Sequence, residues 1–476
     1  MITRRSLLAR SSILVAGGAA GACTPATGVR TASSQSTLID ETAERTFRFF
    51  WDTTNPRNGL VPDRWPSRPF ASIAAVGFAL TAYPIGVERG WVSREQALER
   101  TLTTLRFFWN APQGPAATGV SGHKGFFYHF LDMETGHRFG RTELSSVDTS
   151  LLLGGILFAA SYFTGASPAE REIRDLAGKI HARVDWRWMQ ARAPFVCMGW
   201  HPESGFIPSD WKGYNEAMLV YLLGLGAPDP ARRLGPEAWT AWTATYPNSW
   251  RGEGGSRHLA FAPHFGHQYS HSWIDFRGIR DAMMRDAGMD YFENSRRATY
   301  AQRDYAIRNP MGWKGYSADI WGLTACDGPL GGTHRIDGQP RQFRTYSARG
   351  PLGLPDEFDD GTLAPTAALA SIAFAPEIVL PCATAMHARY GRKLYGKYGF
   401  LDSFNPTLAG AGLPVEKGAV DPELGWFDDE YLGIDQGPIL AMIANHQDDF
   451  VWRYMRKSAP IRDGLLRAGF GGGWLA

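Results

Sequence analysis

The stretch Trp211-Lys-Gly-Tyr-Asn-Glu-Ala-Met-Leu-Val-Tyr-Leu-Leu-Gly-Leu-Gly226 decides the fold class. It is almost wholly apolar from Ala217 to Leu223, which is typical of a helix buried on every side rather than of an amphipathic surface helix. Gly224 and Gly226 indicate where this helix ends. Glu216 is predicted to lie in its first turn, where a carboxylate either complements the helix dipole or works as an acid.

Helical patterns recur in pairs along the rest of the chain. Many of them start at Ser, Asp or Asn and several stop at Gly or Pro, as helix boundaries require. Strand alternation is scarce. The sequence predicts helices near residues 39–51, 72–89, 93–109, 146–164, 167–191, 215–225, 272–286, 291–309, 365–374, 377–390, 435–445 and 448–457.

Buried and half-polar helices alternate in this series. Leu151–Ala160 and Ile439–Ala444 are apolar nearly all round, whereas Ser167–Ala191 and Asp448–Lys457 carry many charges. The alternation predicts an inner and an outer ring of helices, which is an all-α, (α/α)6 toroid forming a single domain over residues 39–476. The long loops Tyr246–Ser270 and Met311–Gly361 are expected to wall a cleft at one end, because loops of such length are usually functional.

The composition restricts the kinds of partner. The chain has 476 residues, of which 44% are hydrophobic and 20% charged, with a formal net charge of +2. This balance is typical of a globular protein and gives no long-range field for nucleic acid. The 17 Trp, 17 Tyr and 27 Phe offer flat faces that suit the stacking of sugar rings. We therefore expect an oligo- or polysaccharide substrate, no nucleic acid, and a monomer.

The first residues resemble an export signal. Arg4-Arg5 precedes the apolar run Ile13–Ala20, which is too short to span a bilayer. Twin arginines before such a run indicate export through the Tat pathway, with a leader over residues 1–27 and a linker over 28–38. Cys23 is either a lipidation site or part of a simply cleaved leader. The protein is therefore expected in the periplasm, or anchored to the outer membrane as a lipoprotein.

Three carboxylates stand at the starts of predicted buried helices: Asp148, Glu216 and Asp435. Capping explains each of them alone, Asp148 through Ser145 or Ser146. If the inner helices share one orientation, however, these carboxylates meet at one mouth of the ring. Paired carboxylates in an aromatic cleft are the usual groups for glycoside hydrolysis, in which one is protonated and the other ionised. A helix start lowers the pKa of Glu216, so burial must outweigh that effect if Glu216 is the acid.

The segment His264-Phe-Gly-His-Gln-Tyr-Ser-His-Ser-Trp-Ile-Asp-Phe-Arg-Gly278 carries three histidines in eight residues. It has no HExxH pattern, so we expect hydrogen-bonding and stacking groups of a ligand cleft rather than a metal site, and no cofactor. Asp275 could equally form a structural ion pair with Arg277 or Arg280. The candidate substrate contacts are Trp211, Tyr214, His267, Tyr269, His271, Trp273, Asp275 and Trp321.

Six motifs in order resemble the bacterial glucoamylase-like family, which includes endo-β-1,2-glucanases and the related domains of cyclic β-1,2-glucan synthases. The resemblance runs from about Phe47 to about Trp452. The motifs are Tyr214-Asn-Glu-Ala-Met, Gln268-Tyr-Ser-His-Ser-Trp-Ile-Asp-Phe-Arg-Gly, Phe292-Glu-Asn-Ser-Arg-Arg-Ala-Thr, Trp321-Gly-Leu-Thr-Ala, Ala364-Pro-Thr-Ala-Ala and Leu432-Gly-Ile-Asp-Gln-Gly-Pro.

The resemblance implies an (α/α)6 toroid and an anomer-inverting glycoside hydrolase of β-glucan, most of all β-1,2-glucan, that uses no metal. By the matching motifs Glu216 is the general acid and Asp435 the candidate base, with Asp148 assisting. The chain departs from members that carry two carboxylates three residues apart, because it has Ser145 and Asp148 at those places. This departure bears on the arrangement of sugar subsites and so on linkage preference.

Two other functions stay open at this point. A polysaccharide lyase on the same fold would use His267, Tyr269, His271 and Arg277 rather than the carboxylates. A non-catalytic lipoprotein would bind glycans through the same cleft without cleaving them.

Overall fold

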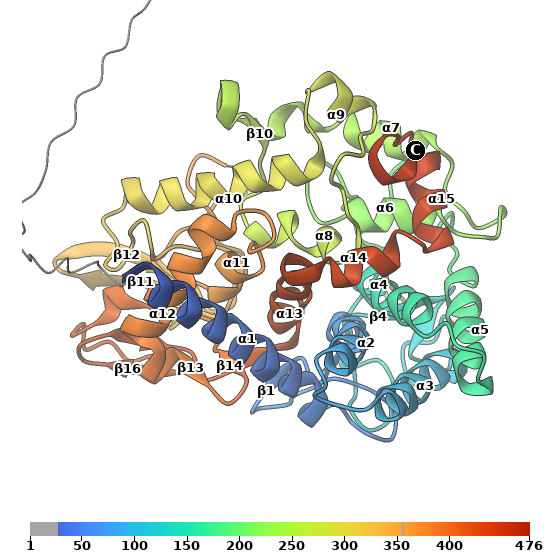
Figure 1. Ribbon diagram of the computed structural model, residues 1–476, viewed down its shortest axis with the longest axis horizontal. Helices are drawn as coiled ribbons and strands as arrows, with labels where there is room; N and C mark the ends of the chain where they lie inside the picture. The colour runs from blue at the N-terminus through green and yellow to red at the C-terminus, as the bar shows by residue number, and fades with distance from the viewer. Residues whose placement is uncertain (1–26, 355–356) are drawn as a thin grey trace, which may run out of the picture.

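The computed structural model describes residues 27–354 and 357–476 (Figure 1). Cys23 and the predicted leader lie outside these residues, apart from Thr27. The first helix, α1, spans Thr27–Thr53 and so runs through residues 28–38, which the sequence analysis assigned to a linker.

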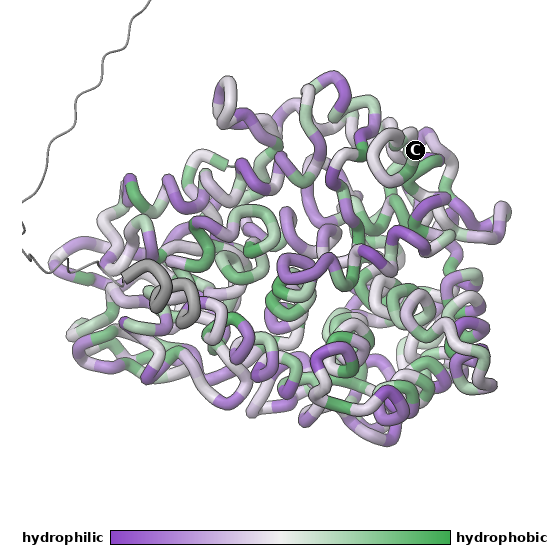
Figure 2. Tube along the Cα trace, viewed as in Figure 1, coloured by the Kyte–Doolittle hydropathy of each residue, from purple (hydrophilic) through white to green (hydrophobic). Residues whose placement is uncertain are grey.

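Six helices with buried sequences form an inner ring. Neighbours in this ring contact one another, for example α2 with α4, α4 with α6, α6 with α8, and α13 with α2 and α11. Figure 2 shows the hydrophobic residues concentrated in these central helices. The ring consists of α2 (Ile73–Glu88), α4 (Ser146–Tyr162), α6 (Met218–Leu225), α8 (Tyr269–Trp273), α11 (Pro365–Leu369) and α13 (Gly433–Asp448).

Outer helices alternate with the inner ones along the chain. They are amphipathic: α5 (Pro168–Ala182), for example, buries Ile173, Leu176 and Ile180 and exposes its charged face. The others are α1, α3 (Arg94–Asn110), α7 (Glu237–Thr243), α10 (Tyr291–Arg308) and α12 (Pro376–Leu394). Two helices follow the last inner one, α14 (Phe450–Met455) and α15 (Ala459–Arg467), and α15 packs on α6. The expected all-α class and (α/α)6 toroid are confirmed.

Some predicted boundaries were wrong. The helix expected over residues 272–286 is two short helices, α8 and α9 (Ala282–Asp286), because the chain between them turns at Gly278, which has a φ of 73°. The helix expected over 167–191 ends at Ala182. Helices α7 and α15 were not predicted, since seven and nine residues carry little periodicity.

Short antiparallel strands line the loops at the starts of the inner helices. The largest sheet has the order β3-β4-β6-β7-β8, formed by Gly122–His123, Phe126–Tyr128, Leu144–Ser145, Gly199–His201 and Gly205–Phe206. A second pair, β1 (Arg64–Trp65) and β18 (Tyr431–Leu432), joins an early loop to the start of α13. These strands were not expected, because two or three residues cannot show alternation.

The remaining strands form five small sheets. They pair β2 (Ala71–Ser72) with β5 (Phe130–Leu131), β9 (Trp250–Arg251) with β10 (His258–Leu259), β11 (Gly332–Ile336) with β12 (Gln339–Phe343), β13 (Tyr395–Gly396) with β14 (Gly399–Phe400), and β17 (Gly425–Phe427) with both β15 (Phe404–Asn405) and β16 (Ala419–Asp421).

The long loop over residues 311–361 is held by a buried ion pair. Arg349 Nε lies 2.8 Å from Asp360 Oδ1, both side chains are fully buried, and Arg349 also donates to the carbonyl oxygen of Cys326.

The cysteines Cys197, Cys326 and Cys382 are all buried and free. Among the described residues, no helix is both long and apolar enough to cross a membrane.

Candidate active site

The starts of α4, α6 and α13 bring three carboxylates into one neighbourhood. Asp148 lies in the first turn of α4 and Asp435 in the first turn of α13. The prediction for Glu216 was wrong in detail, because α6 begins at Met218 and Glu216 lies in the turn before it. Tyr269, the first residue of α8, reports their proximity: burial, and then the charges of Asp435, Glu216 and Asp148, raise its pKa well above the usual value.

Glu216 has the properties of an acid that is still partly protonated at neutral pH. Its side chain is buried, and Oε2 has no hydrogen-bond partner among the described residues. Burial raises the pKa of Glu216 to about 7, a hydrogen bond from its own backbone N–H lowers it, and the charge of Asp148 raises it further. Burial thus outweighs the stabilisation expected at a helix start.

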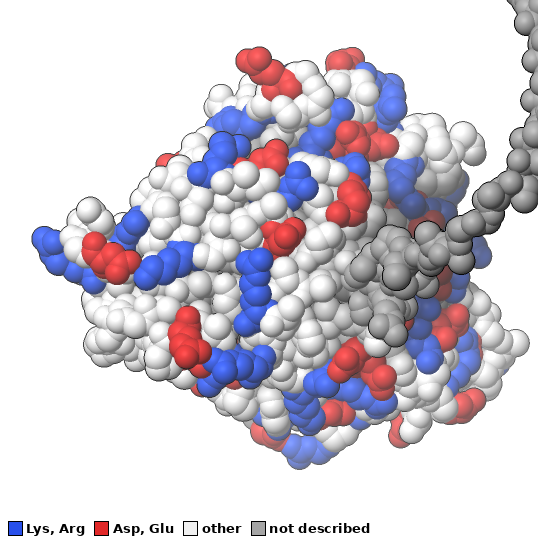
Figure 3. Space-filling model, turned by 60° about the vertical axis from the view of Figure 1, so that its left-hand side comes forward, with Lys and Arg blue, Asp and Glu red and all other residues white. Residues whose placement is uncertain are grey.

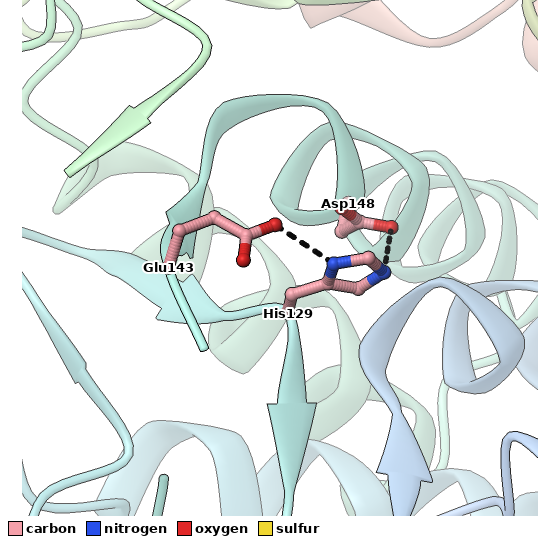
Figure 4. Close-up of side chains that lie close together, drawn as sticks. All are labelled: His129, Glu143 and Asp148. Atoms are coloured by element: carbon pink, nitrogen blue, oxygen red, sulfur yellow. Dashed lines mark hydrogen bonds and ion pairs between the residues drawn. The ribbon is translucent and has the colours of Figure 1, made fainter. Parts of the chain in front are cut away.

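The first group around Glu216, called here the Asp148 group, consists of His129, Glu143 and Asp148 (Figure 4). His129 Nδ1 lies 2.8 Å from Glu143 Oε1, and Nε2 lies 3.4 Å from Asp148 Oδ1. Ser145, the N-cap of α4, accepts a hydrogen bond from the Asp148 N–H and donates one to its carboxylate, as the capping interpretation expected. The ladder from β4 to β6 continues to His129, whose N–H donates to the Glu143 carbonyl oxygen.

The imidazole of His129 is charged in this group. Burial favours its neutral form, but the carboxylates of Asp148 and Glu143 outweigh burial and raise the pKa of His129 to about 9. The same interaction lowers the pKa of Glu143 against the effect of burial. Asp148 is affected more by burial, which raises its pKa although His129 opposes the change. One imidazolium therefore bridges two carboxylates.

The second group, called here the Asp435 group, contains six buried carboxylates: Asp63, Asp327, Asp402, Asp428, Glu430 and Asp435. Burial raises the pKa of Asp435 to about 7, while a hydrogen bond with Asp402 lowers it. The pKa of Asp402 is raised well above its usual value by burial and by the charges of Asp435 and Asp327. We infer that Asp402 carries the shared proton and donates it to Asp435.

Two cations hold this group together. Arg64 Nη1 lies 2.9 Å from Asp327 Oδ2 and 3.2 Å from Glu430 Oε2. Lys417 Nζ contacts Asp327 and lies 2.7 Å from Glu430 Oε2. Neither oxygen of Asp428 has a hydrogen-bond partner within the described ranges, and burial raises the pKa of this residue to about 9. Two positive charges cannot balance six negative ones, so protons must neutralise part of the group.

Two trios of side chains are spaced closely enough to ligate a metal ion: His129 with Glu143 and Asp148, and Asp327 with Asp402 and Asp428. In the first trio both imidazole nitrogens already contact carboxylates. In the second, Lys417 contacts Asp327 and lies 3.7 Å from Asp428 Oδ1. In each trio a cation of the protein, His129 in the first and Lys417 in the second, already compensates carboxylates.

Five of the expected substrate contacts have side chains that are packed in the interior and stay predictions. Tyr214 stacks against Tyr291 and His267, and Trp273 stacks against Phe78 while donating to Thr81. A fully buried ring cannot stack on a sugar. The five residues are Tyr214, His267, His271, Trp273 and Trp321, each at most 1% exposed.

The other three expected contacts, Trp211, Tyr269 and Asp275, differ in their surroundings. Asp275 is the structural ion pair that the sequence left open, with Arg277 at 2.8 Å and with Arg456. Trp211 is 7% exposed and donates its indole N–H to Ser146 at the start of α4. Tyr269 lies among the three carboxylates and stays a candidate contact.

The lyase alternative loses its main residues, since His267 and His271 are buried and Arg277 pairs with Asp275 and Asp449.

Sequence reasoning missed several residues of the site: Arg64, His129, Tyr346, Asp402 and Lys417. Tyr346 lies on the loop over residues 311–361, within reach of the charges of Asp435, Asp63 and Asp402. Burial and the nearby charges of Asp435, Asp63 and Asp402 raise its pKa well above the usual value. The only sequence signal was the presence of such residues in long loops, which does not indicate which of them meet.

A toroid of paired helices whose inner helix starts gather buried carboxylates, one of them protonated at neutral pH, defines a protein of the glycoside hydrolase class. Residues 208–459, more than half of the chain, match the model of the glycoamylase family, whose description is glucoamylase. The chain belongs to this family.

Several relatives are similar over nearly the whole chain. A glucoamylase-like protein of Bacteroides uniformis is 30% identical, with a TM-score of 0.78 over 93% of this chain and 99% of that one. A β-1,2-glucanase structure from Parabacteroides distasonis is 25% identical, with a TM-score of 0.76 over 91% of this chain and 60% of that one. An exo β-1,2-glucooligosaccharide sophorohydrolase (non-reducing end) from the same species is 26% identical in an alignment of 459 positions that covers 90% of this chain. The match spans 57% of that sophorohydrolase.

Proposed function

We propose that the protein is a glycoside hydrolase that cleaves β-1,2-glucan with inversion at the anomeric carbon. Its similarity to a sophorohydrolase and to a β-1,2-glucanase supports the choice of glucan. The observation that carries the proposal is the state of Glu216: a buried carboxyl with an unpartnered oxygen and a pKa of about 7, beside Asp148.

In this proposal Glu216 is the general acid. Its proton passes to the glycosidic oxygen as the bond from that oxygen to the anomeric carbon breaks, so the leaving sugar departs as a neutral alcohol. The charge of Asp148 helps to keep Glu216 protonated until substrate binds. His129 in turn holds Asp148 in place.

Asp435 is the proposed base. It takes a proton from the attacking water, directly or through a substrate hydroxyl, while the water oxygen bonds to the anomeric carbon from the opposite face. The hydrogen bond from Asp402 lowers the pKa of Asp435 and so favours the ionised form that a base needs. Two carboxyls with distinct partners can thereby hold the two protonation states that inversion requires.

The decisive experiment compares wild type with Glu216→Gln on linear β-1,2-glucan, starch, laminarin and cellulose. We expect reducing ends from β-1,2-glucan and a kcat loss of about 10²–10⁴-fold in the variant, since proton transfer by a positioned group contributes that much. Gln keeps the size of the side chain, so a cooperative thermal transition no lower than that of wild type serves as the folding control. More than a few per cent of wild-type activity in E216Q would reject Glu216 as the acid.

Product analysis tests the stereochemistry and the alternative functions. Inversion at a β-linkage predicts that the α-anomer appears first in proton NMR, and a first-formed β-anomer would indicate retention. Product sizing separates endo from exo cleavage. Products of a uronate polymer that absorb in the ultraviolet would favour the lyase, and oligosaccharide binding without any cleavage would favour a binding protein.

We also propose that the protein is exported by the Tat pathway to the periplasm, on the basis of Arg4-Arg5 and the apolar run after them. Replacement of both arginines by lysine should leave the protein in the cytoplasm in cell fractionation. Metabolic labelling with a lipid precursor, compared between wild type and Cys23→Ser, tests whether Cys23 carries a membrane anchor. Periplasmic protein from the twin-lysine variant would contradict the Tat proposal.

A further inference from the structure

A second cavity lies away from the carboxylates, along the outer helix α10. Its volume is about 630 Å³, within the usual range of about 300–1,000 Å³ for small-molecule sites. It is bounded by α10, by the segment from Arg251 to His267 that contains β10, and by Pro351–Leu354. In Figure 1 these elements lie on the periphery, above the inner ring. None of Asp148, Glu216 and Asp435 lines it.

The floor of this cavity consists of neutral histidines. His258, His264 and His267 line it and are buried. Burial lowers the pKa of all three, that of His264 to about 3, so the rings are neutral at neutral pH, and His258 Nδ1 already donates to the Ser256 carbonyl oxygen. His264 Nε2 is paired with Thr299, but Nδ1 of His267 has no hydrogen-bond partner in the described part of the chain. A buried polar atom without a partner indicates a bound hydroxyl or water.

Two of the four arginines that line the cavity, Arg296 and Arg297, are paired with carboxylates. Arg297 Nε lies 2.7 Å from Glu293, and Arg296 Nη2 lies 2.6 Å from Glu377. Arg251 donates to the backbone carbonyls of Asn248, Trp250 and Gly353. Figure 3 shows acidic and basic side chains interspersed on the face that it displays, without a large area of one sign. Glu293 and Asp304 also line the cavity, so its net charge is small and a neutral polar ligand suits it.

The walls present apolar and aromatic surface above this polar floor. Phe261, Tyr300 and Leu352 line the cavity and are half-buried or exposed. A cavity that combines aromatic faces with groups that both donate and accept hydrogen bonds matches a pyranose, which has apolar ring faces and a rim of hydroxyls. His267, which was expected to contact substrate beside the carboxylates, contributes to the floor of this cavity, which the three carboxylates do not line.

We propose that this cavity is a second, non-catalytic binding site for a neutral glucan oligosaccharide. The choice of β-1,2-glucan as the ligand rests on the proposed function; the class of ligand rests on the cavity alone. Such a site would hold one segment of a polymeric substrate on the outside of the toroid, which raises the local substrate concentration at the catalytic cleft.

The test is a binding measurement on the full chain carrying Glu216→Gln, so that nothing is hydrolysed. Sophorose, laminaribiose and cellobiose are titrated by calorimetry into this protein and into the same protein with Ala301→Trp. Ala301 is a half-buried residue of α10 that lines the cavity, so a tryptophan there fills it from the solvent side. The matched control is Ile307→Trp on the same helix, at a residue that is 50% exposed and does not line the cavity.

We expect two sites for one disaccharide in E216Q and in its I307W derivative, and one site in its A301W derivative. A second derivative, Phe261→Ala, should weaken the same site at least about tenfold if its ring stacks on the sugar. Equal stoichiometry with and without A301W, for every disaccharide, would overturn the second site and leave the proposed function intact. If the site that A301W leaves intact were missing while A301W still abolished the other one, the result would count against sugar binding in the catalytic cleft and leave the second site standing.

Discussion

The Asp148 group, which lies beside Glu216, and the Asp435 group, which holds the proposed base, neutralise their charges differently. In the first, a single imidazolium bridges two carboxylates and sits between them at hydrogen-bonding distance. In the second, six carboxylates share Arg64, Lys417 and at least one proton, which we place on Asp402 beside Asp435. Stability and activity should therefore depend on His129 in the first group. In the second they should depend on the Asp402 proton and on Arg64 and Lys417.

The difference shows how one cleft can hold an acid and a base. An ionised Asp148 placed near Glu216 raises the pKa of Glu216, whereas a protonated Asp402 placed at Asp435 lowers the pKa of Asp435. Both central residues have a pKa of about 7, so small changes in either group shift the balance between them. Asp402 and Asp435 interact closely, so a rate profile reports the values of that pair for the base.

The largest expected effect comes from Asp435→Asn, which removes the proposed base. We expect kcat on β-1,2-glucan to fall about 10²–10⁴-fold, because the attacking water is no longer activated. Asp402→Asn keeps a hydrogen-bond donor toward Asp435 and should retain much more activity than Asp402→Ala. Equal losses in the two Asp402 variants would contradict the role given to its proton.

A smaller effect, on stability, is expected from Lys417→Met. Removing one cation leaves Asp327 and Glu430 less compensated, and we expect a loss of about 2 kcal/mol at pH 7, below the range for a fully buried pair because Lys417 is partly exposed. Urea denaturation measures this loss, which should shrink near pH 4 as the carboxylates take up protons. The control is Lys397→Met, an exposed lysine beside Asp52, with an expected loss below about 1 kcal/mol.

The Asp148 group predicts a pH dependence of stability. The folded pKa of His129 is raised to about 9 from 6.5, so its favourable contribution is present below pH 6.5 and is lost as pH rises through about 9. We expect wild type to lose about 2 kcal/mol over this range relative to His129→Gln. The kinetic pKa assigned to Glu216 should also rise in H129Q, because Asp148 is then uncompensated. If H129Q showed the wild-type pH dependence of both stability and reaction rate, the bridging role of His129 would be refuted.

The smallest effect concerns the acid itself. The folded pKa of Glu216 is raised from 4.5 to about 7, so its proton stabilises the fold at low pH and this contribution is lost as pH rises from about 4.5 through 7. Glu216→Gln removes the loss of stability that ionisation of the buried carboxyl causes at high pH. We expect the melting temperature of E216Q to exceed that of wild type by a few degrees at pH 8 and to equal it near pH 4. A lower melting temperature at pH 8 would mean that Glu216 is ionised without cost.

Local patterns in the chain were sufficient for the ring of helices. Apolar runs such as Leu151–Ala160 and Ile439–Ala444 can only be buried, and charged stretches such as Asp448–Lys457 must face water, so the alternation of layers follows from burial alone. The same patterns placed Asp148, Glu216 and Asp435 near helix starts, because helix boundaries depend on neighbouring residues.

Tertiary structure alone decided which side chains meet. His129 reaches Asp148 through the register of β4 with β6, and Arg64 reaches Asp327 and Glu430, which lie hundreds of residues away in the chain. It also turned His267 and Trp273 from expected cleft residues into core residues, since an apolar sequence does not say which of its faces is covered. Contacts between distant loops, and the pKa values that arise from them, depend on distances in space that no local pattern in the sequence encodes.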